Sequence, residues 1–153
     1  MHRPTDSPTT NNDPFIWLTH DHNHILSLFR QFLQHKNTTI KSRINTFEHI
    51  KQAVEKHEKI EEKIFYPTAK RTEEVRELGF ESYEEHFVLN FLLNKLDEMP
   101  KEHEEWQPTF TVLFENMERH FAKEEKEIFE KMRKSLTQEQ LNQIMAEIIE
   151  LTK

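Results

Sequence analysis

Apolar residues recur three and four positions apart along most of this chain, which is the spacing of one face of an α-helix. Four long stripes and one shorter stripe follow this rule, and each predicts an amphipathic helix. The stripes are Phe15, Leu18, His22, Ile25, Phe29 and Phe32; Phe47, Ile50, Val54, His57, Glu61 and Ile64; His86, Leu89, Leu93 and Leu96; Phe110, Leu113, Met117, His120, Glu124 and Ile128; and Leu141, Ile144, Met145, Ile148 and Ile149.

Capping residues and prolines mark the ends of the first two predicted helices. Asp13-Pro14 offers an N-cap followed by proline at the first helical position, so we expect a helix from there to about Lys36. The segment 37–39, Asn-Thr-Thr, breaks the apolar pattern and caps the second helix. Pro67 is expected to end or kink that second helix, because proline cannot donate a backbone hydrogen bond.

The third long helix is expected to begin only after a break in the chain. Residues 72–78 predict a short helical turn that stops at Gly79. Ser82-x-x-Glu85 is a capping box, which predicts that the helix opens there, and Met99-Pro100 closes it.

Two further signals complete the predicted fold. Pro108 opens the fourth helix after a polar connection, and Thr137-x-x-Gln140 is a capping box for a last helix that ends near Leu151. Short connections favour antiparallel neighbours, so we expect an all-α fold: an up-down-up-down four-helix bundle with an additional C-terminal helix. The expected division is a disordered leader at 1–12, the bundle at 13–134, and the C-terminal helix at 135–153, packed on or extending the bundle.

Composition agrees with this fold and narrows the chemistry. A single glycine and 32% charged residues favour helices over strands. The chain has no cysteine, so any metal must be held by nitrogen and oxygen, and a cytoplasmic location is expected. A net charge of -7 without a basic run argues against nucleic-acid binding. No apolar stretch approaches the roughly 20 residues that span a membrane, and no secretory signal follows the first methionine.

Four histidines interrupt four different apolar stripes, so each is expected to point into the core. They are His22, His57, His86 and His120, and two of them carry a glutamate four residues later, Glu61 and Glu124. Counted from the predicted helix ends, all four histidines lie at one depth of the bundle, within one turn. An unpartnered buried imidazole or carboxylate costs roughly several kcal/mol. A metal cluster held from four helices would satisfy all six groups.

Two of these segments form an internal repeat. His57 to Phe65, HEKIEEKIF, and His120 to Ile128, HFAKEEKEI, align without a gap on H-x-x-x-E-E-K. Two matched helix pairs are what a pseudo-symmetric two-metal site would use.

With these residues in place, the chain resembles the hemerythrin-like (HHE cation-binding) family from Leu18 to about Met132. The resemblance rests on Asp21-His22-x-x-Ile25, His57-x-x-Ile60-Glu61-Glu62, Glu84-Glu85-His86 and His120-x-x-x-Glu124-Glu125. It implies a non-haem di-iron centre inside a four-helix bundle. It also implies a small-molecule partner, since family members carry or sense oxygen or nitric oxide, or decompose peroxide.

The sequence departs from the oxygen carriers of that family in two places. Their third helix offers H-x-x-x-H, whereas Asn90 stands at the second position here. Their last helix uses H-x-x-x-x-D, whereas Glu124 or Glu125 can coordinate here, and we favour Glu124 because it shares a face with His120. Both departures weaken the case for reversible oxygen carriage. Glu125, Glu58 and Asn90 are kept as alternative ligands.

The expected cofactor is a pair of iron ions with a bridging oxo or hydroxo group, with manganese or zinc as alternatives. Two six-coordinate irons offer twelve positions, of which four histidines, two bridging glutamates and the bridging oxygen fill ten. The two open positions would admit oxygen, nitric oxide or hydrogen peroxide. The other functions considered are an iron- or oxygen-responsive regulatory or interaction module with a structural metal, iron storage, and a metal-free scaffold.

Several polar residues are interpreted without a role at the metal. Glu62 is read as a solvated helix charge, Tyr66 as a packing and capping aromatic, and His49 as a surface residue. The expected assembly is a monomer or a weak homodimer, and peroxide decomposition is the one enzymatic activity considered.

Overall fold

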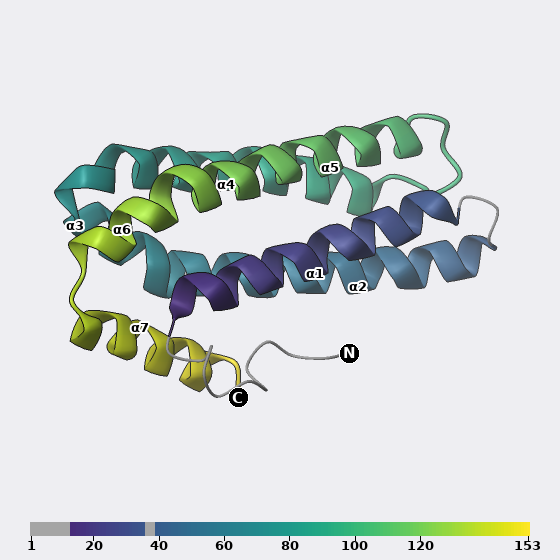
Figure 1. The fold of residues 1–153 in the computed structure, drawn as a ribbon. Helices are drawn as coiled ribbons and strands as arrows, with labels where there is room; N and C mark the ends of the chain where they lie inside the picture. The colour runs from purple at the N-terminus through teal and green to yellow at the C-terminus, as the bar shows by residue number, and fades with distance from the viewer. Residues whose placement is uncertain (1–12, 36–38) are drawn as a thin grey trace.

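The structure, a computed structural model, describes residues 13–35 and 39–153, and every regular element in these ranges is a helix. Four long helices form the bundle: α1 (Pro14–Gln34), α2 (Ile40–Ile60), α4 (Arg76–Glu98) and α5 (Trp106–Lys123). Figure 1 shows them running alternately up and down, with α1 beside α2 and α4 beside α5. The predicted all-α bundle with an added C-terminal helix is therefore confirmed. The predicted leader, 1–12, lies outside the described residues.

Two of the long helices continue through a π-helical turn, at the same place in each half of the bundle. The segment η2 (Glu61–Phe65) joins α2 to α3 (Tyr66–Arg71), and η4 (Glu124–Ile128) joins α5 to α6 (Phe129–Ser135). Pro67 lies in the first turn of α3, so the helical run passes it instead of ending there. Because η4 forms without a proline, the π turn belongs to the repeat and is not caused by Pro67. Such turns are frequent at functional sites.

Helix α4 begins earlier than its sequence signals predict. It runs from Arg76 through Gly79 and Ser82, so the predicted stop at Gly79 and the predicted start at Ser82 are wrong. Gly79 is needed for close packing: a Cβ atom there would lie 3.2 Å from the Cβ of Ala69 on α3. Ser82 is fully buried and caps nothing. The predicted turn at 72–78 is replaced by a short 3₁₀ segment, η3 (Glu73–Val75), and the start of α4.

The other capping signals are reproduced by the structure, with one small shift. The Asp13 side chain accepts hydrogen bonds from the backbone N–H groups of Phe15 and Ile16. Thr39 caps α2, and both bonds of the predicted capping box at Thr137 are present at the start of α7 (Gln138–Leu151). Helix α5 begins two residues before Pro108, at Trp106, where the indole N–H donates to the carbonyl of Leu96. The predicted end of α1 at Lys36 lies outside the described residues.

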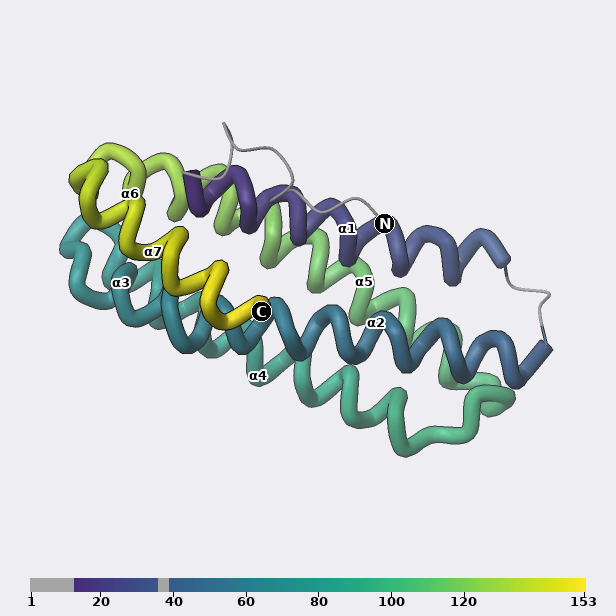
Figure 2. The backbone as a smooth tube through the Cα atoms, turned by 90° about the horizontal axis from the view of Figure 1, so that it is seen from below, coloured from purple at the N-terminus to yellow at the C-terminus, as the bar shows by residue number. Residues whose placement is uncertain are grey.

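The core consists of two apolar clusters, one toward each end of the bundle. One contains Phe15, Phe65 and Phe129 together with the buried face of α7, and the other contains Phe29, Phe47 and Trp106. Helix α7 packs on the side of the bundle near one end, as Figure 2 shows, and it contacts α1 and η2. None of the described helices is long and apolar enough to span a membrane. The buried histidines and glutamates lie between the two apolar clusters.

Candidate metal centre

The structure brings together the six residues that the sequence singled out. They come from four long helices and the two π turns, and each has at most 3% of its surface exposed: His22, His57, Glu61, His86, His120 and Glu124. Their donor atoms form two groups, within each of which all donor atoms lie within 4.8 Å of one another. We call them the His22 group (His22, His57, Glu61, Glu124) and the His86 group (His86, His120, Glu61, Glu124). Both carboxylates belong to both groups.

Within the His22 group, the inward-facing atoms stand at the spacing of metal ligands. The Nε2 atom of His22 lies 3.1 Å from Glu124 Oε1 and 3.5 Å from Glu61 Oε2, and His57 Nε2 lies 3.1 Å from the same Glu61 oxygen. Donors at right angles around one ion, each about 2.1 Å from it, lie roughly 3 Å apart. All four atoms are buried and none makes a hydrogen bond. A cation between them would satisfy all four.

The His86 group contains a further oxygen that the sequence reasoning missed. The Tyr66 hydroxyl donates to Glu124 Oε2 at 2.6 Å, and its oxygen lies 2.9 Å from His86 Nε2. The same oxygen lies 3.1 Å from Glu61 Oε1 and 3.3 Å from His120 Nε2. The Tyr66 oxygen therefore also stands at ligand spacing from four donor atoms of this group. Tyr66 is 1% exposed and is more than a packing aromatic.

Each histidine is held from behind by a carboxylate. The Nδ1 atoms lie at hydrogen-bond distance from one acidic residue each: His22 from Glu125 at 2.7 Å, His57 from Asp21 at 2.7 Å, His86 from Glu62 at 2.7 Å, and His120 from Glu85 at 2.6 Å. With the proton on Nδ1, each imidazole donates outward and keeps the Nε2 lone pair for the interior. Such outer carboxylates orient metal-bound histidines.

Two of the four outer carboxylates follow the internal repeat, which is the signal that could have found them. Glu62 and Glu125 come directly after the inward-facing Glu61 and Glu124. Asp21 and Glu85 come directly before His22 and His86, and each holds the histidine of the neighbouring helix. The interpretation of Glu62 as a solvated charge was therefore wrong, because its carboxylate bonds to His86.

The three alternative ligands lie outside the two groups. Glu125 bonds to the outer nitrogen of His22, so Glu124 alone of this pair faces the interior. Glu58 is 7% exposed and forms a separate group with Glu62 and His86. Asn90 is half-buried and lines a surface cavity together with Glu58.

Without a metal, protonated imidazoles compensate the negative charges of the buried carboxylates. Burial alone would lower the pKa of His22, but the carboxylates of Glu124, Glu125 and Glu61 raise it to about 9. The pKa values of His57 and His120 are also raised, against burial, by their carboxylate neighbours. Burial would raise the pKa of Glu61, but the surrounding imidazoles hold it well below its usual range. Neutral imidazoles would therefore leave the carboxylates uncompensated unless cations replaced the protons.

Two other ionisable groups beside the centre also have raised pKa values. Burial and the carboxylates of Glu124 and Glu61 raise the pKa of Tyr66 well above its usual value. Burial raises the pKa of Glu58 to about 7.

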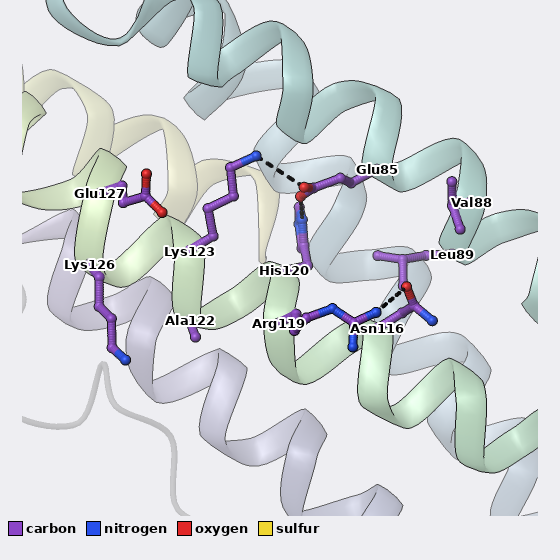
Figure 3. Close-up of a pocket in the computed structure, with 10 residues that line it drawn as sticks. All are labelled: Glu85, Val88, Leu89, Asn116, Arg119, His120, Ala122, Lys123, Lys126 and Glu127. Atoms are coloured by element: carbon purple, nitrogen blue, oxygen red, sulfur yellow. Dashed lines mark hydrogen bonds and ion pairs between the residues drawn. The ribbon is translucent and has the colours of Figure 1, made fainter.

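A surface groove of about 400 Å³ between α4 and α5 reaches the outer side of His120. Figure 3 shows Glu85 there between His120 and Lys123, with an interaction to each. The Nζ atom of Lys123 lies 3.0 Å from Glu85, which anchors the carboxylate that orients His120.

Comparison with known proteins agrees with the site. No curated protein and no solved structure matched the chain. The model of one family, described as the hemerythrin HHE cation binding domain, matches residues 13–132, a range that includes all six inward-facing donors. Imidazole and carboxylate ligands suit a transition-metal ion. The chain, with its buried His/Glu cluster, therefore belongs to the hemerythrin HHE cation-binding domain family.

Proposed function

We propose that this protein binds two iron ions, joined by a bridging oxo or hydroxo group, and that the pair takes up oxygen, nitric oxide or hydrogen peroxide. The observation that carries the proposal is the sharing of Glu61 and Glu124 by two donor groups. Two carboxylates common to two pairs of histidines are the arrangement that two neighbouring ions require.

In this proposal the two ions have unequal sets of protein ligands. His22 and His57 would hold one ion, His86 and His120 would hold the other, and the two glutamates would be shared between them. The Tyr66 oxygen, at ligand spacing from four donors of the His86 group, is a fifth protein ligand for the second ion. With one bridging oxygen the second ion would have six ligands, and the first ion would have five and room for one more.

The internal repeat explains the inequality. Phe129 stands where Tyr66 stands in the other half, directly after the π turn, and it has no oxygen to offer. Its ring centroid lies 5.8 Å from that of His22, and the Phe121 ring stacks on His22 with 3.8 Å between centroids. The first ion is therefore bordered by aromatic rings. An apolar border suits a small, uncharged ligand such as oxygen, nitric oxide or hydrogen peroxide.

The redox metal pair would supply ligand binding and electron transfer, and the chain supplies orientation and exclusion of water. The outer carboxylates keep the four Nδ1 protons in place, so the Nε2 atoms remain available as ligands. The aromatic rings keep bulk water from the His22 side, where Phe121 and His22 are both 2% exposed or less.

A second candidate function is a metal-responsive interaction module. It is favoured by the packing of α7 against η2, the π turn that begins with Glu61. Loss of the metal would leave Glu61 less firmly held. Because Glu61 begins η2, the packing of α7 against η2 would then weaken. Iron-dependent exposure of α7 without reaction toward oxygen, nitric oxide or peroxide would select this function.

Reconstitution with ferrous iron under anaerobic conditions tests the main proposal. We expect about two irons per chain and near-ultraviolet oxo-to-iron absorption after oxidation. The reduced protein is then mixed with oxygen, hydrogen peroxide and nitric oxide in turn in a stopped-flow spectrometer. A stable adduct indicates carriage or sensing, and rapid loss of peroxide indicates an enzyme. Protein that stays colourless and iron-free would refute the proposal.

A further inference from the structure

A second surface cavity opens near the metal centre. It lies on the other side of α4 from the groove of Figure 3. It measures about 400 Å³ and lies between α2, η2 and α4, where it is lined by Glu55, Glu58, Lys59, Glu62, Lys63, Asn90 and Asn94. Three carboxylates and two lysines border it. The groove of Figure 3 has three basic residues and two carboxylates instead. Of the two openings, this cavity has the charge that attracts cations.

Glu58 is the residue that connects this cavity to the interior. Its side chain lines the outer cavity and also a narrow enclosed space bordered by His57, His86 and His120. Only 7% of its surface is exposed, and its Oε2 atom has no hydrogen-bond partner. A buried carboxylate oxygen without a partner is costly. This atom is therefore available to a cation.

Three donors converge at this point. Glu58, Glu62 and His86 each offer one ligand atom, and these atoms lie within 4.8 Å of one another. The Nδ1 atom of His86 faces this cluster, 2.7 Å from Glu62, whereas its Nε2 atom faces the metal centre, 3.1 Å from Glu61. His86 thus lies on the border of both sites. A divalent cation that displaces the Nδ1 proton of His86 would meet two carboxylate oxygens and one imidazole nitrogen, which suit a transition-metal ion.

Among the described residues, the other half of the bundle shows no such route. Phe121 follows His120 as Glu58 follows His57, and its ring stacks on His22 with 3.8 Å between centroids. An aromatic ring therefore closes the position that a carboxylate opens in the first half. Glu58 and Phe121 are corresponding positions of the repeat H-x-x-x-E-E-K. The two halves therefore differ here, and only the half with Glu58 has a carboxylate at this position.

We propose that Glu58 and Glu62, with His86, form a transit site through which a divalent cation passes from the outer cavity to the metal centre. The inference rests on the proposed metal centre and adds the route by which that centre is filled. The cation is held first by the two carboxylates and then transferred past His86 to the donors inside.

The test is the rate at which metal-free protein takes up Co²⁺ in an anaerobic stopped-flow experiment, followed by the visible absorption of the bound ion. Glu58→Gln keeps the shape of the side chain and removes its charge. We expect uptake to slow by about tenfold or more, because an electrostatic funnel raises association rates by that order. The final content should remain two Co²⁺ per chain. The matched control is Glu127→Gln on the opposite groove, which should load at the wild-type rate.

Glu58→Asp provides a second variant. Its rate of Co²⁺ uptake should fall between those of Glu58→Gln and the wild type, because the shorter side chain keeps the carboxylate but places it farther from the other donors. Equal rates of Co²⁺ uptake for Glu58→Gln and the wild type would refute the transit site without contradicting the proposed metal centre. A final content below two for Glu58→Gln would overturn it as well, by making Glu58 a ligand of the centre. Wild-type protein that binds no Co²⁺ would refute the metal centre itself, and the transit site with it.

Discussion

Tyr66 and Phe129 occupy the same position in the two halves of the bundle, each directly after a π turn, and only Tyr66 brings an oxygen to the centre. The Tyr66 oxygen lies 2.6 Å from Glu124 Oε2, and the Phe129 ring faces His22. The two donor groups are therefore related by the repeat but differ chemically.

Replacing Tyr66 by phenylalanine should remove the fifth protein ligand of the second ion. We expect the wild-type iron protein to absorb in the visible through phenolate-to-iron charge transfer, and Tyr66→Phe to lose this band while keeping two irons. Because burial and two carboxylates raise the pKa of Tyr66, metal-free protein should show no phenolate absorption at pH 8. Tyr83→Phe is the matched control, since that ring lies 6.4 Å from Tyr66 outside the donor groups. Persistence of the band in Tyr66→Phe would exclude the ligand role.

Phe129→Tyr makes the complementary change. By the repeat, its hydroxyl should reach the His22 group and occupy the open position of the first ion. We expect unchanged iron content and nitric oxide binding weakened by at least about tenfold, which corresponds to roughly 1.4 kcal/mol. The measurement is an anaerobic nitric oxide titration of the reduced protein. Wild-type affinity in this variant would place the open position elsewhere.

Loss of one inner histidine should abolish the two-metal centre. His57→Ala and His120→Ala each remove one of four imidazoles and leave a buried glutamate four residues later without that partner. We expect fewer than two irons per chain and no oxo-to-iron absorption. His49→Ala, on the exposed side of α2, should keep two irons per chain and the oxo-to-iron absorption. Full iron content in both inner variants would show that the ligand assignment is wrong.

Removing the metal should destabilise the fold, because the buried carboxylates and imidazoles then lack a common cation. A ligand present at 100 times its Kd stabilises a protein by about 2.7 kcal/mol. For a chain of this size, that corresponds to a fall in Tm of roughly 5–10 °C on removal of one such ion. Differential scanning calorimetry with and without a chelator measures the change. Equal Tm values would contradict metal binding in the core.

The buried carboxyl of Glu58 should make the stability of the metal-free protein depend on pH. Its pKa is about 7 in the folded protein against an ordinary 4.5. Below 4.5 the group is protonated in both states and costs nothing. Between 4.5 and 7 the unfolded chain ionises first, so folded stability falls as pH rises, by at most about 3 kcal/mol.

Glu58→Gln removes this dependence. Its free energy of unfolding relative to the wild type should therefore rise between pH 5 and pH 8, as urea denaturation would measure. The exposed Glu127→Gln should show no such trend. A constant difference between Glu58→Gln and the wild type across this range would contradict the raised pKa.

The sequence was sufficient to predict the bundle and the six inward-facing donors, because both follow from helical periodicity. His57 and Glu61 share a helix face whatever the neighbouring helices do, and the same holds for His120 and Glu124. Tyr66 could not be found in this way. In a regular α-helix a residue five positions after Glu61 lies about 140° around the axis. The π turn places it nearly in line instead, and the Tyr66 N–H donates to the Glu61 carbonyl.

Other misses arose from contacts that local signals do not contain. Gly79 and Ser82 have the sequence features of a helix end and a helix start, yet α4 passes through both. Close approach to Ala69 on α3 explains the glycine, and only the packing of the two helices reveals it. The outer carboxylates of Asp21 and Glu85 belong to the same class, since each bonds to a histidine of another helix.

Glu61 and Glu124 each present one oxygen to each donor group, and this shared use links the two positions thermodynamically. An ion that arrives first fixes the orientation of both carboxylates and so lowers the entropy cost for the next ion. In the proposed two-iron centre, this coupling favours the filling of the second position once the first is occupied.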